Sequence, residues 1–407
     1  MKEVSLNPYP PAEVLEEMTQ VATALVKRQF YQQGYPFDME VNLSGYYEWL
    51  RQTGLCDVTL INVGDPYKDS WDMLDTDVFE RRCIDFFAET FAFGEAHWGV
   101  LSNGGTDGNM HGLFFGRKYL EDVAREMGLD EKQGKPILYV SHEAHYSVRK
   151  LGDILQIETR VIGSHPMGQM DTDDLRRQLD PNRPALVAIA IGGTFKGAID
   201  DQEAIAQVLE EKQPPCVYRH LDAALFGGYL PWVEEDSAKK ILNQQHQKFD
   251  SIAVSGHKFL AMNEPAGIFL CRKEILNHLH NSPIPYLNTN IPTISCSRSG
   301  FDCLKLYWRI QTTGAEGFRK ETAHVLKMTR ILREKLAEKG IPTYVNPFST
   351  TVCMPRPADR VVHKYAMASN SCPHFGEISH VVVMQFFNEA LIQELVDDVV
   401  TGNAHDK

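Results

Sequence analysis

The segment Ala185-Leu-Val-Ala-Ile-Ala-Ile191 contains only apolar residues, and it runs directly into Gly192-Gly-Thr-Phe-Lys-Gly-Ala-Ile-Asp-Asp201. A strand of this composition has no polar side, so it must be buried on both faces. Strands of this kind are typical of parallel sheets that helices cover on both sides. The segment therefore predicts an inner strand of an α/β sheet, with Thr194 just beyond its end as a candidate for a ligand contact.

Further apolar strands alternate with helical patterns up to about residue 275. Helices are predicted over 78–92, 108–127 and 202–212. This alternation is typical of a parallel sheet covered on both faces, in which ligands bind at the carboxyl ends of the strands.

Three regions are expected along the chain. Residues 1–60 would form an N-terminal helical arm, 61–285 a large ligand-binding domain, and 286–407 a mobile segment followed by a small α+β domain. The last region is predicted to hold a long amphipathic helix at 315–339, strands near 342–354 and 379–385, and helices at 357–368 and 388–400.

Another apolar strand, Ser251-Ile-Ala-Val-Ser255, leads into Gly256-His-Lys258. A lysine at a rigid strand end can be partly desolvated, which lowers its pKa and allows the neutral amine to attack a carbonyl. Ser255 and His257 lie beside it as hydrogen-bond donors to a phosphate or ring oxygen. Alone, the motif also fits a surface turn with a solvated lysine, so the interpretation depends on the other motifs.

The strand Val217-Tyr-Arg-His-Leu-Asp222 ends in a carboxylate, and small residues follow it. This arrangement suits pyridoxal phosphate. A carboxylate paired with the pyridine nitrogen keeps that nitrogen protonated, and the ring then acts as an electron sink. The alternative is that Asp222 caps the next helix.

A glycine turn, Asn103-Gly-Gly-Thr106, lies between a predicted strand and a predicted helix. Backbone N–H groups and the positive end of a helix can bind a phosphate in this geometry. Gly104, Gly105 and Thr106 are therefore predicted to hold the phosphate, although the turn matches neither a Walker loop nor a full GxGxxG pattern.

The polar turn His142-Glu-Ala-His145 follows the strand Ile137–Ser141. It lacks the HExxH spacing that places two metal ligands on one face of a helix, so no metal site is predicted here. Stacking of an imidazole on the pyridine ring is the better use of His145, and His142 is interpreted as structural.

Together these motifs resemble the fold-type I pyridoxal-phosphate enzymes of the group II amino-acid decarboxylase family. Within it, the chain is most similar to the branch of bacterial histidine decarboxylases and plant serine decarboxylases. The resemblance covers nearly the whole chain in family order. It rests on Gln33-Gly-Tyr-Pro36, Asn62-Val-Gly-Asp-Pro66, Asn103-Gly-Gly-Thr-Asp-Gly-Asn109, His145-Tyr-Ser-Val148, Gly197-Ala-Ile-Asp-Asp201, His220-Leu-Asp-Ala-Ala224, Val254-Ser-Gly-His-Lys258 and His380-Val-Val-Val-Met384.

The resemblance implies an aspartate aminotransferase-like fold, with a mostly parallel seven-stranded sheet in the large domain and a small α+β C-terminal domain. It also implies pyridoxal 5'-phosphate as the cofactor. Lys258 would form the Schiff base, Asp222 would pair with the pyridinium, His145 would stack on the ring, and Ala224 would lie under its opposite face.

Further site residues follow from the same resemblance. Thr194, Ser255 and His257 fall at cofactor-contacting positions of the family, and Tyr286 of the mobile segment is the candidate proton donor to the reacting carbon. The active site of this fold is built at a subunit interface, so a homodimer is expected, with residues 9–35 lying across the partner.

The implied reaction is decarboxylation of a polar L-amino acid, histidine first and serine second. Glu264 lies in a stretch that is usually uncharged in the branch and would also tolerate a cationic side chain, such as that of a diamino acid, if it faced the pocket. Decarboxylation of a diamino or an acidic amino acid is therefore a further alternative. An aminotransferase or another fold-type I lyase is the alternative, since a transaminase normally clamps the substrate carboxylate with an arginine; Arg298 and Arg356 are the candidates for that clamp. A non-catalytic binding protein is less consistent with the retained cofactor residues.

Composition agrees with an enzyme that acts on a small molecule. The 407 residues are 43% hydrophobic, and the net charge of −13 argues against nucleic acid or an anionic membrane as partner. The chain contains neither a secretory signal pattern nor an apolar run of membrane-spanning length, so a cytoplasmic location is expected. The eight cysteines are scattered, which predicts reduced thiols.

Overall fold

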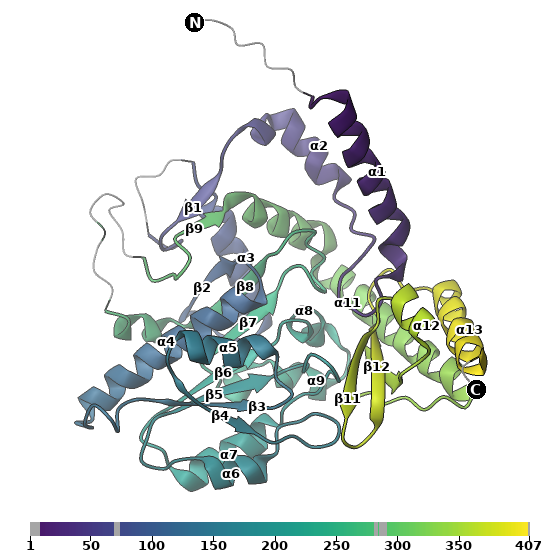
Figure 1. Ribbon diagram of the computed structural model, residues 1–407. Coiled ribbons are helices and arrows are strands. Elements are labelled where there is room, and N and C mark those ends of the chain that lie inside the picture. The colour runs from purple at the N-terminus through teal and green to yellow at the C-terminus, as the bar shows by residue number, and fades with distance from the viewer. Residues whose placement is uncertain (1–8, 69–73, 281–283, 285–290, 406–407) are drawn as a thin grey trace, which may run out of the picture.

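A seven-stranded sheet forms the centre of the computed structural model, which describes residues 9–68, 74–280, 284 and 291–405 (Figure 1). The strand order is β2-β8-β7-β6-β5-β3-β4. β8 runs antiparallel to both neighbours, and the other adjacent pairs are parallel, which confirms the predicted sheet. The strands are β2 (His97–Ser102), β3 (Ile137–Ser141), β4 (Glu158–Ile162), β5 (Ala185–Ala190), β6 (Val217–Asp222), β7 (Ser251–Ser255) and β8 (Gly267–Arg272).

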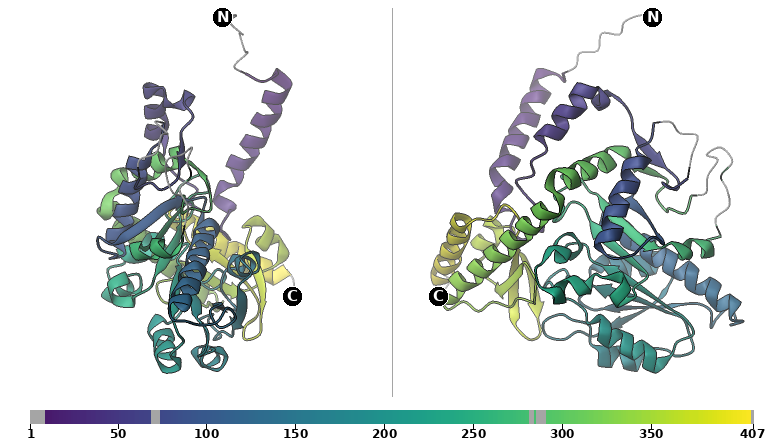
Figure 2. Two further views of the ribbon diagram at one scale, coloured as in Figure 1. Left: turned by 90° about the vertical axis from the view of Figure 1, so that its left-hand side faces the viewer. Right: turned by 180° about the vertical axis from the view of Figure 1, so that it is seen from behind.

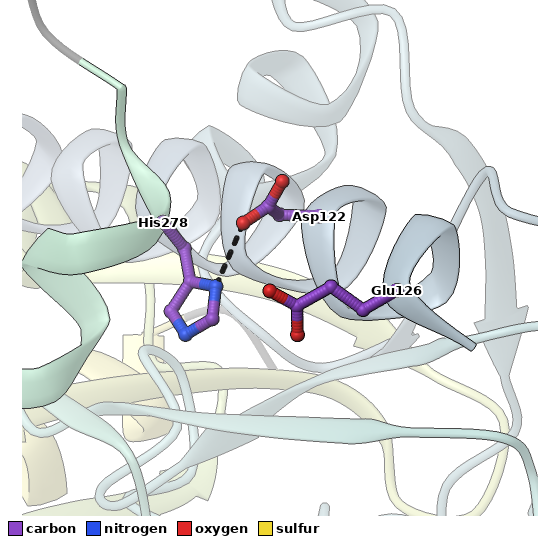
Figure 3. A group of neighbouring side chains, drawn as sticks. All are labelled: Asp122, Glu126 and His278. Carbon is purple, nitrogen blue, oxygen red and sulfur yellow. Dashed lines mark hydrogen bonds and ion pairs between the residues drawn. The ribbon is translucent and has the colours of Figure 1, made fainter. Parts of the chain in front are cut away.

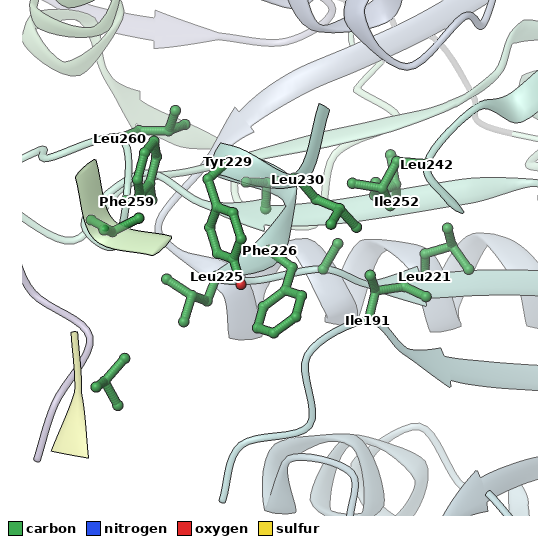
Figure 4. Packing of buried hydrophobic residues seen from close by; sticks show 14 of the residues in the cluster. Ile191, Leu221, Leu225, Phe226, Tyr229, Leu230, Leu242, Ile252, Phe259 and Leu260 are labelled. Atoms are coloured by element: carbon green, nitrogen blue, oxygen red, sulfur yellow. The ribbon is translucent and has the colours of Figure 1, made fainter. Parts of the chain in front are cut away.

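Both faces of this sheet are covered, as the composition of the strand at 185–190 requires. Every residue of β5 is buried. Its side chains alternate between two hydrophobic clusters, since Leu186 and Ala188 belong to one and Val187 and Ile189 to the other. Figure 4 shows part of the larger cluster around Phe226 and Tyr229.

The helices that cover the sheet agree with the predicted segments. The segment predicted at 78–92 corresponds to α3, which ends two residues earlier, and the one at 108–127 to α4, which begins three residues earlier. The segment predicted at 202–212 coincides with α7. The helices of this region are α3 (Asp77–Thr90), α4 (Gly105–Glu126), α5 (Tyr146–Ile154), α6 (Thr172–Gln178), α7 (Gln202–Lys212), α8 (Phe226–Tyr229), α9 (Asp236–Ile241) and α10 (Gln244–Gln247), with the 3-10 helices η3 (Leu230–Trp232) and η4 (Lys273–His278).

The C-terminal region places a second, three-stranded antiparallel sheet beside the long helix α11 (Gly300–Glu338). The helix is longer than the predicted run at 315–339, because it continues across Gly314, whose φ of 59° interrupts the helical backbone. The sheet has the order β10 (Thr351–Pro355), β12 (Gly376–Val382), β11 (Ala368–Cys372), and α12 (Asp359–Lys364) and α13 (Glu389–His405) complete the region.

One expectation for this region was wrong. The helix predicted over 357–368 ends at Lys364, and the strand β11 that begins at Ala368 was not predicted. β11 is an edge strand of sequence Ala-Ser-Asn-Ser-Cys, with exposed residues at its centre. It has no apolar alternation to indicate a strand, and its pairing with β12 determines its conformation.

The N-terminal arm begins with α1 (Ala12–Arg28) and η1 (Gln29–Tyr31), followed by α2 (Ser44–Thr53) and η2 (Leu55–Asp57). No residue of α1 is buried, and the helix projects from the rest of the chain (Figures 1 and 2). β1 (Ile61–Val63) pairs with β9 (Ser297–Ser299). No helix among the described residues is long and apolar enough to cross a bilayer. The domain boundaries at residues 60 and 285 stay predictions.

A stripe of glycines brings α4 close to the central sheet. Gly108, Gly112 and Gly116 lie four residues apart, hence on one face of the helix. A Cβ atom at Gly112 would lie 2.2 Å from Nδ1 of His220, and one at Gly116 would lie 2.7 Å from the ring of Tyr218. Any larger side chain here would push α4 away from β6, so the stripe fixes the position of the helix at the sheet.

We predict that Gly112→Ala destabilises the protein. The added methyl group must displace His220 or the helix, which typically costs about 1–3 kcal/mol in a packed core. Urea denaturation of the holoenzyme measures the loss. Gly45→Ala in α2 is the control, because its Cβ would find its nearest neighbour at 3.4 Å. Equal stability of the Gly112→Ala protein and the wild type would contradict this account of the stripe.

Candidate active site

A cavity of about 490 Å³ lies at the carboxyl ends of β5, β6 and β7. Its lining includes ten of the eleven residues predicted for the site: Gly104, Gly105, Thr106, His145, Thr194, Asp222, Ala224, Ser255, His257 and Lys258. Residues from positions 104 to 258 thus meet in one place, as the arrangement of a parallel sheet predicts. Tyr286 lies outside the described residues.

Lys258 follows β7 in a turn that backbone hydrogen bonds hold in place. The N–H of Ser255 donates to the carbonyl of Ala224 at 2.9 Å, and the N–H of Ala261 donates to the carbonyl of Lys258 at 3.0 Å. Burial lowers the pKa of Lys258, and the nearby carboxylate of Asp222 opposes this shift. A solvated surface turn is therefore the wrong interpretation of this motif.

The carboxylate of Asp222 is held at the end of β6 by an amide from α4. Nδ2 of Asn109 donates to Oδ2 of Asp222 at 2.9 Å, and the N–H of Ala224 donates to Oδ1 at 3.3 Å. The proposed alternative, that Asp222 caps the next helix, is wrong, because α8 is preceded by Leu225 and has no side-chain cap. The side chain is instead oriented in the cavity wall.

Two further buried side chains determine how Asn109 is oriented. Nε2 of His220 lies 3.0 Å from Oδ1 of Asn109, and Nδ1 of His220 lies 2.8 Å from Oγ of Ser251. Burial lowers the pKa of His220 to about 4, so the ring is neutral at pH 7. Because an amide oxygen only accepts, Nε2 must carry the proton, and Ser251 must donate to Nδ1. The chain of bonds therefore presents the NH₂ group of Asn109 to Asp222.

Asn109 and His220 are functional candidates that the sequence did not reveal. Both lie within motifs quoted for the family resemblance, yet their pairing joins positions 111 residues apart. The only local signal is His220 itself, a polar residue within an apolar strand, which must find a partner when it is buried.

The glycine turn before α4 has the conformation expected of an anion site. Gly104 has a φ of 108°, which favours glycine, and a Cβ at Gly105 would lie 2.5 Å from Oγ of Ser255. The first N–H groups of α4 have no acceptor within the helix. The backbone of Gly105 and Thr106 and the hydroxyl of Ser255 are therefore suited to a phosphate.

His145 immediately precedes α5, and its ring is fixed by Ser147. Oγ of Ser147 lies 2.6 Å from Nδ1 of His145, and the N–H of Ser147 donates to the same nitrogen at 3.4 Å. Burial lowers the pKa of His145, as does the charge of Lys258, while Asp222 opposes them. A neutral, flat imidazole at the cavity wall suits stacking on an aromatic ring.

The charged residues noted from the sequence lie elsewhere. Arg298 is buried against Glu80, with Nη2 and Oε2 2.9 Å apart, and Arg356 pairs with Asp359 at 2.5 Å. Glu264, which would have faced the pocket in a diamino-acid decarboxylase, instead pairs with Lys305 at 3.0 Å. Of the described residues that line the cavity, none is an arginine or a glutamate.

Comparison with known proteins agrees with this geometry. A family model described as the pyridoxal-dependent decarboxylase conserved domain matches residues 76–353. Histidine decarboxylase of Solanum lycopersicum is 32% identical over 94% of this chain and 87% of its own. Serine decarboxylase 1 of Oryza sativa subsp. japonica is 33% identical over 88% of this chain and 70% of its own. Histidine decarboxylase of Morganella morganii is 30% identical over 93% of this chain and 95% of its own.

Solved structures share the fold at lower identity. The L-methionine decarboxylase of Streptomyces sp. 590 superposes with a TM-score of 0.83 at 20% identity, covering 98% of this chain and 97% of the other. The glutamate decarboxylase of Lactobacillus brevis gives a TM-score of 0.79 at 19% identity, covering 98% and 95%.

We predict that Asn109→Ala weakens cofactor binding. The substitution removes the amide that orients Asp222 toward the cofactor, and the loss of such a hydrogen bond to a charged group costs about 1–3 kcal/mol of binding free energy. This corresponds to a loss of about 5- to 150-fold in affinity for pyridoxal phosphate, measured by titrating the apoenzyme. Asn182→Ala, in an exposed loop, is the control. An unchanged affinity in Asn109→Ala would mean that Asp222 does not depend on this amide.

Proposed function

Because the chain belongs to the pyridoxal-dependent decarboxylase family, we propose that it removes the α-carboxylate of a polar L-amino acid, with histidine preferred and serine second. It is a pyridoxal-phosphate-dependent amino-acid decarboxylase; its preferred substrate and its catalytic residues are what we propose here. The observation that carries it is the meeting of Lys258, Asp222 and the glycine turn in a cavity whose described lining contains no arginine.

The cavity of about 490 Å³ and its lining support a site for the cofactor. We infer that Gly105, Thr106 and Ser255 hold the phosphate, that His145 stacks on one face of the ring, and that Ala224 leaves room at the other face. When bound, pyridoxal phosphate supplies an electron sink for the electron pair that remains when CO₂ departs.

The residues around the ring control protons and charge. Asp222, oriented by Asn109, would hold a proton on the pyridine nitrogen. Lys258 would hold the cofactor covalently until the substrate amine replaces it, and its lowered pKa provides more of the neutral amine than a solvated lysine would. Tyr286 stays the proposed proton donor to the product carbon.

The absence of arginine from the described lining favours decarboxylation over transamination. A bidentate arginine would stabilise the substrate carboxylate in the ground state, and that stabilisation would have to be lost before CO₂ could leave. The two candidate arginines are paired with Glu80 and Asp359, away from the cavity. The carboxylate can therefore depart without breaking a strong ion pair to either of them.

The walls of the cavity also limit the side chain of the substrate. Apart from Asp222 and Lys258, its described lining contains no carboxylate and no lysine, which gives neither a cationic nor an acidic side chain a partner. Phe195 and Thr351 offer one apolar and one polar surface. We infer an uncharged polar side chain, for which histidine and serine are the candidates that the relatives suggest.

We expect the holoenzyme to release CO₂ from histidine, more slowly from serine, and not from lysine or glutamate. Each amino acid is supplied singly while CO₂ and the cofactor absorbance are followed together. Lys258→Ala should lower the rate by about 10³-fold or more and remove the lysine-dependent absorbance band, whereas Lys240→Ala, at an exposed position, should change neither.

Other outcomes separate the alternatives. CO₂ from another amino acid would refute the substrate proposal but not the decarboxylase. An absorbance change without CO₂ for any amino acid would point to transamination or to carbon–carbon cleavage.

We further propose that the chain is a homodimer, with α1 lying across the partner. Val14, Met18, Val21 and Leu25 follow one another on one face of α1, and all four are exposed. An exposed apolar stripe of this length is typical of a helix that packs against another surface. The cytoplasmic location also stays a prediction.

We predict that the double variant Val21→Glu, Leu25→Glu weakens the dimer, because two charges would be buried at the interface. Sedimentation velocity over a range of protein concentrations should show dimers for the wild type and dissociation for the variant. Lys27→Glu, which also alters charge on α1, is the control. A wild type that is monomeric and active would refute the proposal.

A further inference from the structure

We propose that the C-terminal end of α4 and the turn after β8 form a binding site for a divalent transition-metal ion. Asp122, Glu126, His278 and His280 would be its ligands. Figure 3 shows the carboxylates of Asp122 and Glu126 directed toward the imidazole of His278 across the gap between α4 and η4. One ligand atom of each of these three residues lies within 4.8 Å of those of the other two.

Local structure brings these ligands together from two elements. Asp122 and Glu126 are four residues apart on α4 and therefore share one face of the helix. His278 is the last residue of η4, and His280 follows it by two residues. The ring of Tyr119 meets that of His278 edge to face, at a centroid distance of 4.9 Å, which fixes the orientation of the imidazole.

Asp122 already lies between the two histidines. Its Oδ2 lies 2.9 Å from Nδ1 of His278, and its Oδ1 lies 2.8 Å from Nε2 of His280. The Asp122 side chain is only 8% exposed and that of His278 only 20%, so both are partly ordered by packing. In a tetrahedral site with ligand bonds of 2.0–2.1 Å, neighbouring ligand atoms lie about 3.3 Å apart. To reach that geometry both exposed ligands must move: Glu126 toward Asp122 and His278, and His280, whose side chain is 62% exposed, from its place beside Oδ1 of Asp122 toward the other three ligands.

The ligand types indicate the class of ion. Two imidazole nitrogens with two carboxylate oxygens suit Zn²⁺, Co²⁺, Ni²⁺ or Cu²⁺, whereas Mg²⁺ and Ca²⁺ prefer oxygen alone. One neighbour opposes binding: the guanidinium of Arg125 lies 2.5 Å from Oδ1 of Asp122. Its side chain is 70% exposed and can turn into solvent, so Arg125 would weaken binding without preventing it.

The site is distinct from the cofactor cavity. Asp122 lies 17 residues after Gly105 on the same helix, which corresponds to about 25 Å along its axis. A bound ion would join η4 to α4. Its effect would therefore be to stabilise the fold rather than to take part in the chemistry.

The test is a calorimetric titration with Zn²⁺ and with Co²⁺. It uses holoenzyme that carries no histidine tag and has been treated with a chelator to remove bound metal. We expect one ion per chain and a melting temperature that rises with ion concentration. His278→Ala and Glu126→Gln should each lower the affinity by about 10- to 100-fold. Arg125→Gln should raise it. The control is Glu121→Gln, which removes the same charge as Glu126→Gln from a position next to the site. Glu121 pairs with Arg117, so this variant should bind the ion with unchanged affinity.

Two results would overturn the proposal. One is no saturable binding at micromolar ion concentrations. The other is binding that persists at wild-type affinity in both His278→Ala and Glu126→Gln, which would place the ion on other histidines. Melting curves recorded without metal establish whether each variant is folded. The higher metal affinity expected for Arg125→Gln cannot arise from damage to the fold.

Discussion

The arrangement of the cavity depends on one partly buried hydrogen bond, from the amide of Asn109 to the carboxylate of Asp222. A carboxylate at the end of a buried strand is costly unless it is hydrogen-bonded, and a rotating amide would be a poor partner. The neutral ring of His220 fixes that amide, and Ser251 fixes the ring. The bond can form only because α4 lies close to β6, which the glycine at position 112 permits.

Burial and charge act in opposite directions on Lys258. Desolvation favours the neutral amine, whereas the carboxylate of Asp222 favours the ammonium form, and the pKa is lowered because burial prevails. The same carboxylate also raises the pKa of His145 against the effect of burial, yet that pKa is lowered as well. Burial thus shifts both bases of the cavity toward their neutral forms, which is the state required of a lysine nucleophile and a stacking imidazole.

Residues close together in sequence, or fixed by strand ends, could be predicted. The continuous apolar strand at 185–190 indicated the covered parallel sheet, and the motifs at strand ends indicated the cavity, because parallel strands bring their carboxyl ends to one edge. Interactions over long sequence separations could not be predicted. Glu264 is paired with Lys305, and Arg298 with Glu80. Neither partner can be inferred from local composition, so the sequence left open whether either charged residue faces the substrate. The polar edge strand β11 was missed for a similar reason, because its partner strand determines it.

Helix α4 connects all of these features. Its first turn overlaps the glycine turn, where the first N–H groups have no acceptor within the helix, and its second turn supplies Asn109. The glycines at 108, 112 and 116 hold it against the sheet, and its last turns carry Asp122 beside His278. Polar groups on a helix packed so closely cannot adjust independently, because a shift of the helix moves all of them. The close contact with β6 therefore sets both the geometry of the cofactor site and that of the histidine–carboxylate cluster about 25 Å away. A ligand bound at the Asp122–His278 end of α4 would therefore rigidify a helix that the sheet already holds in place near the cofactor site.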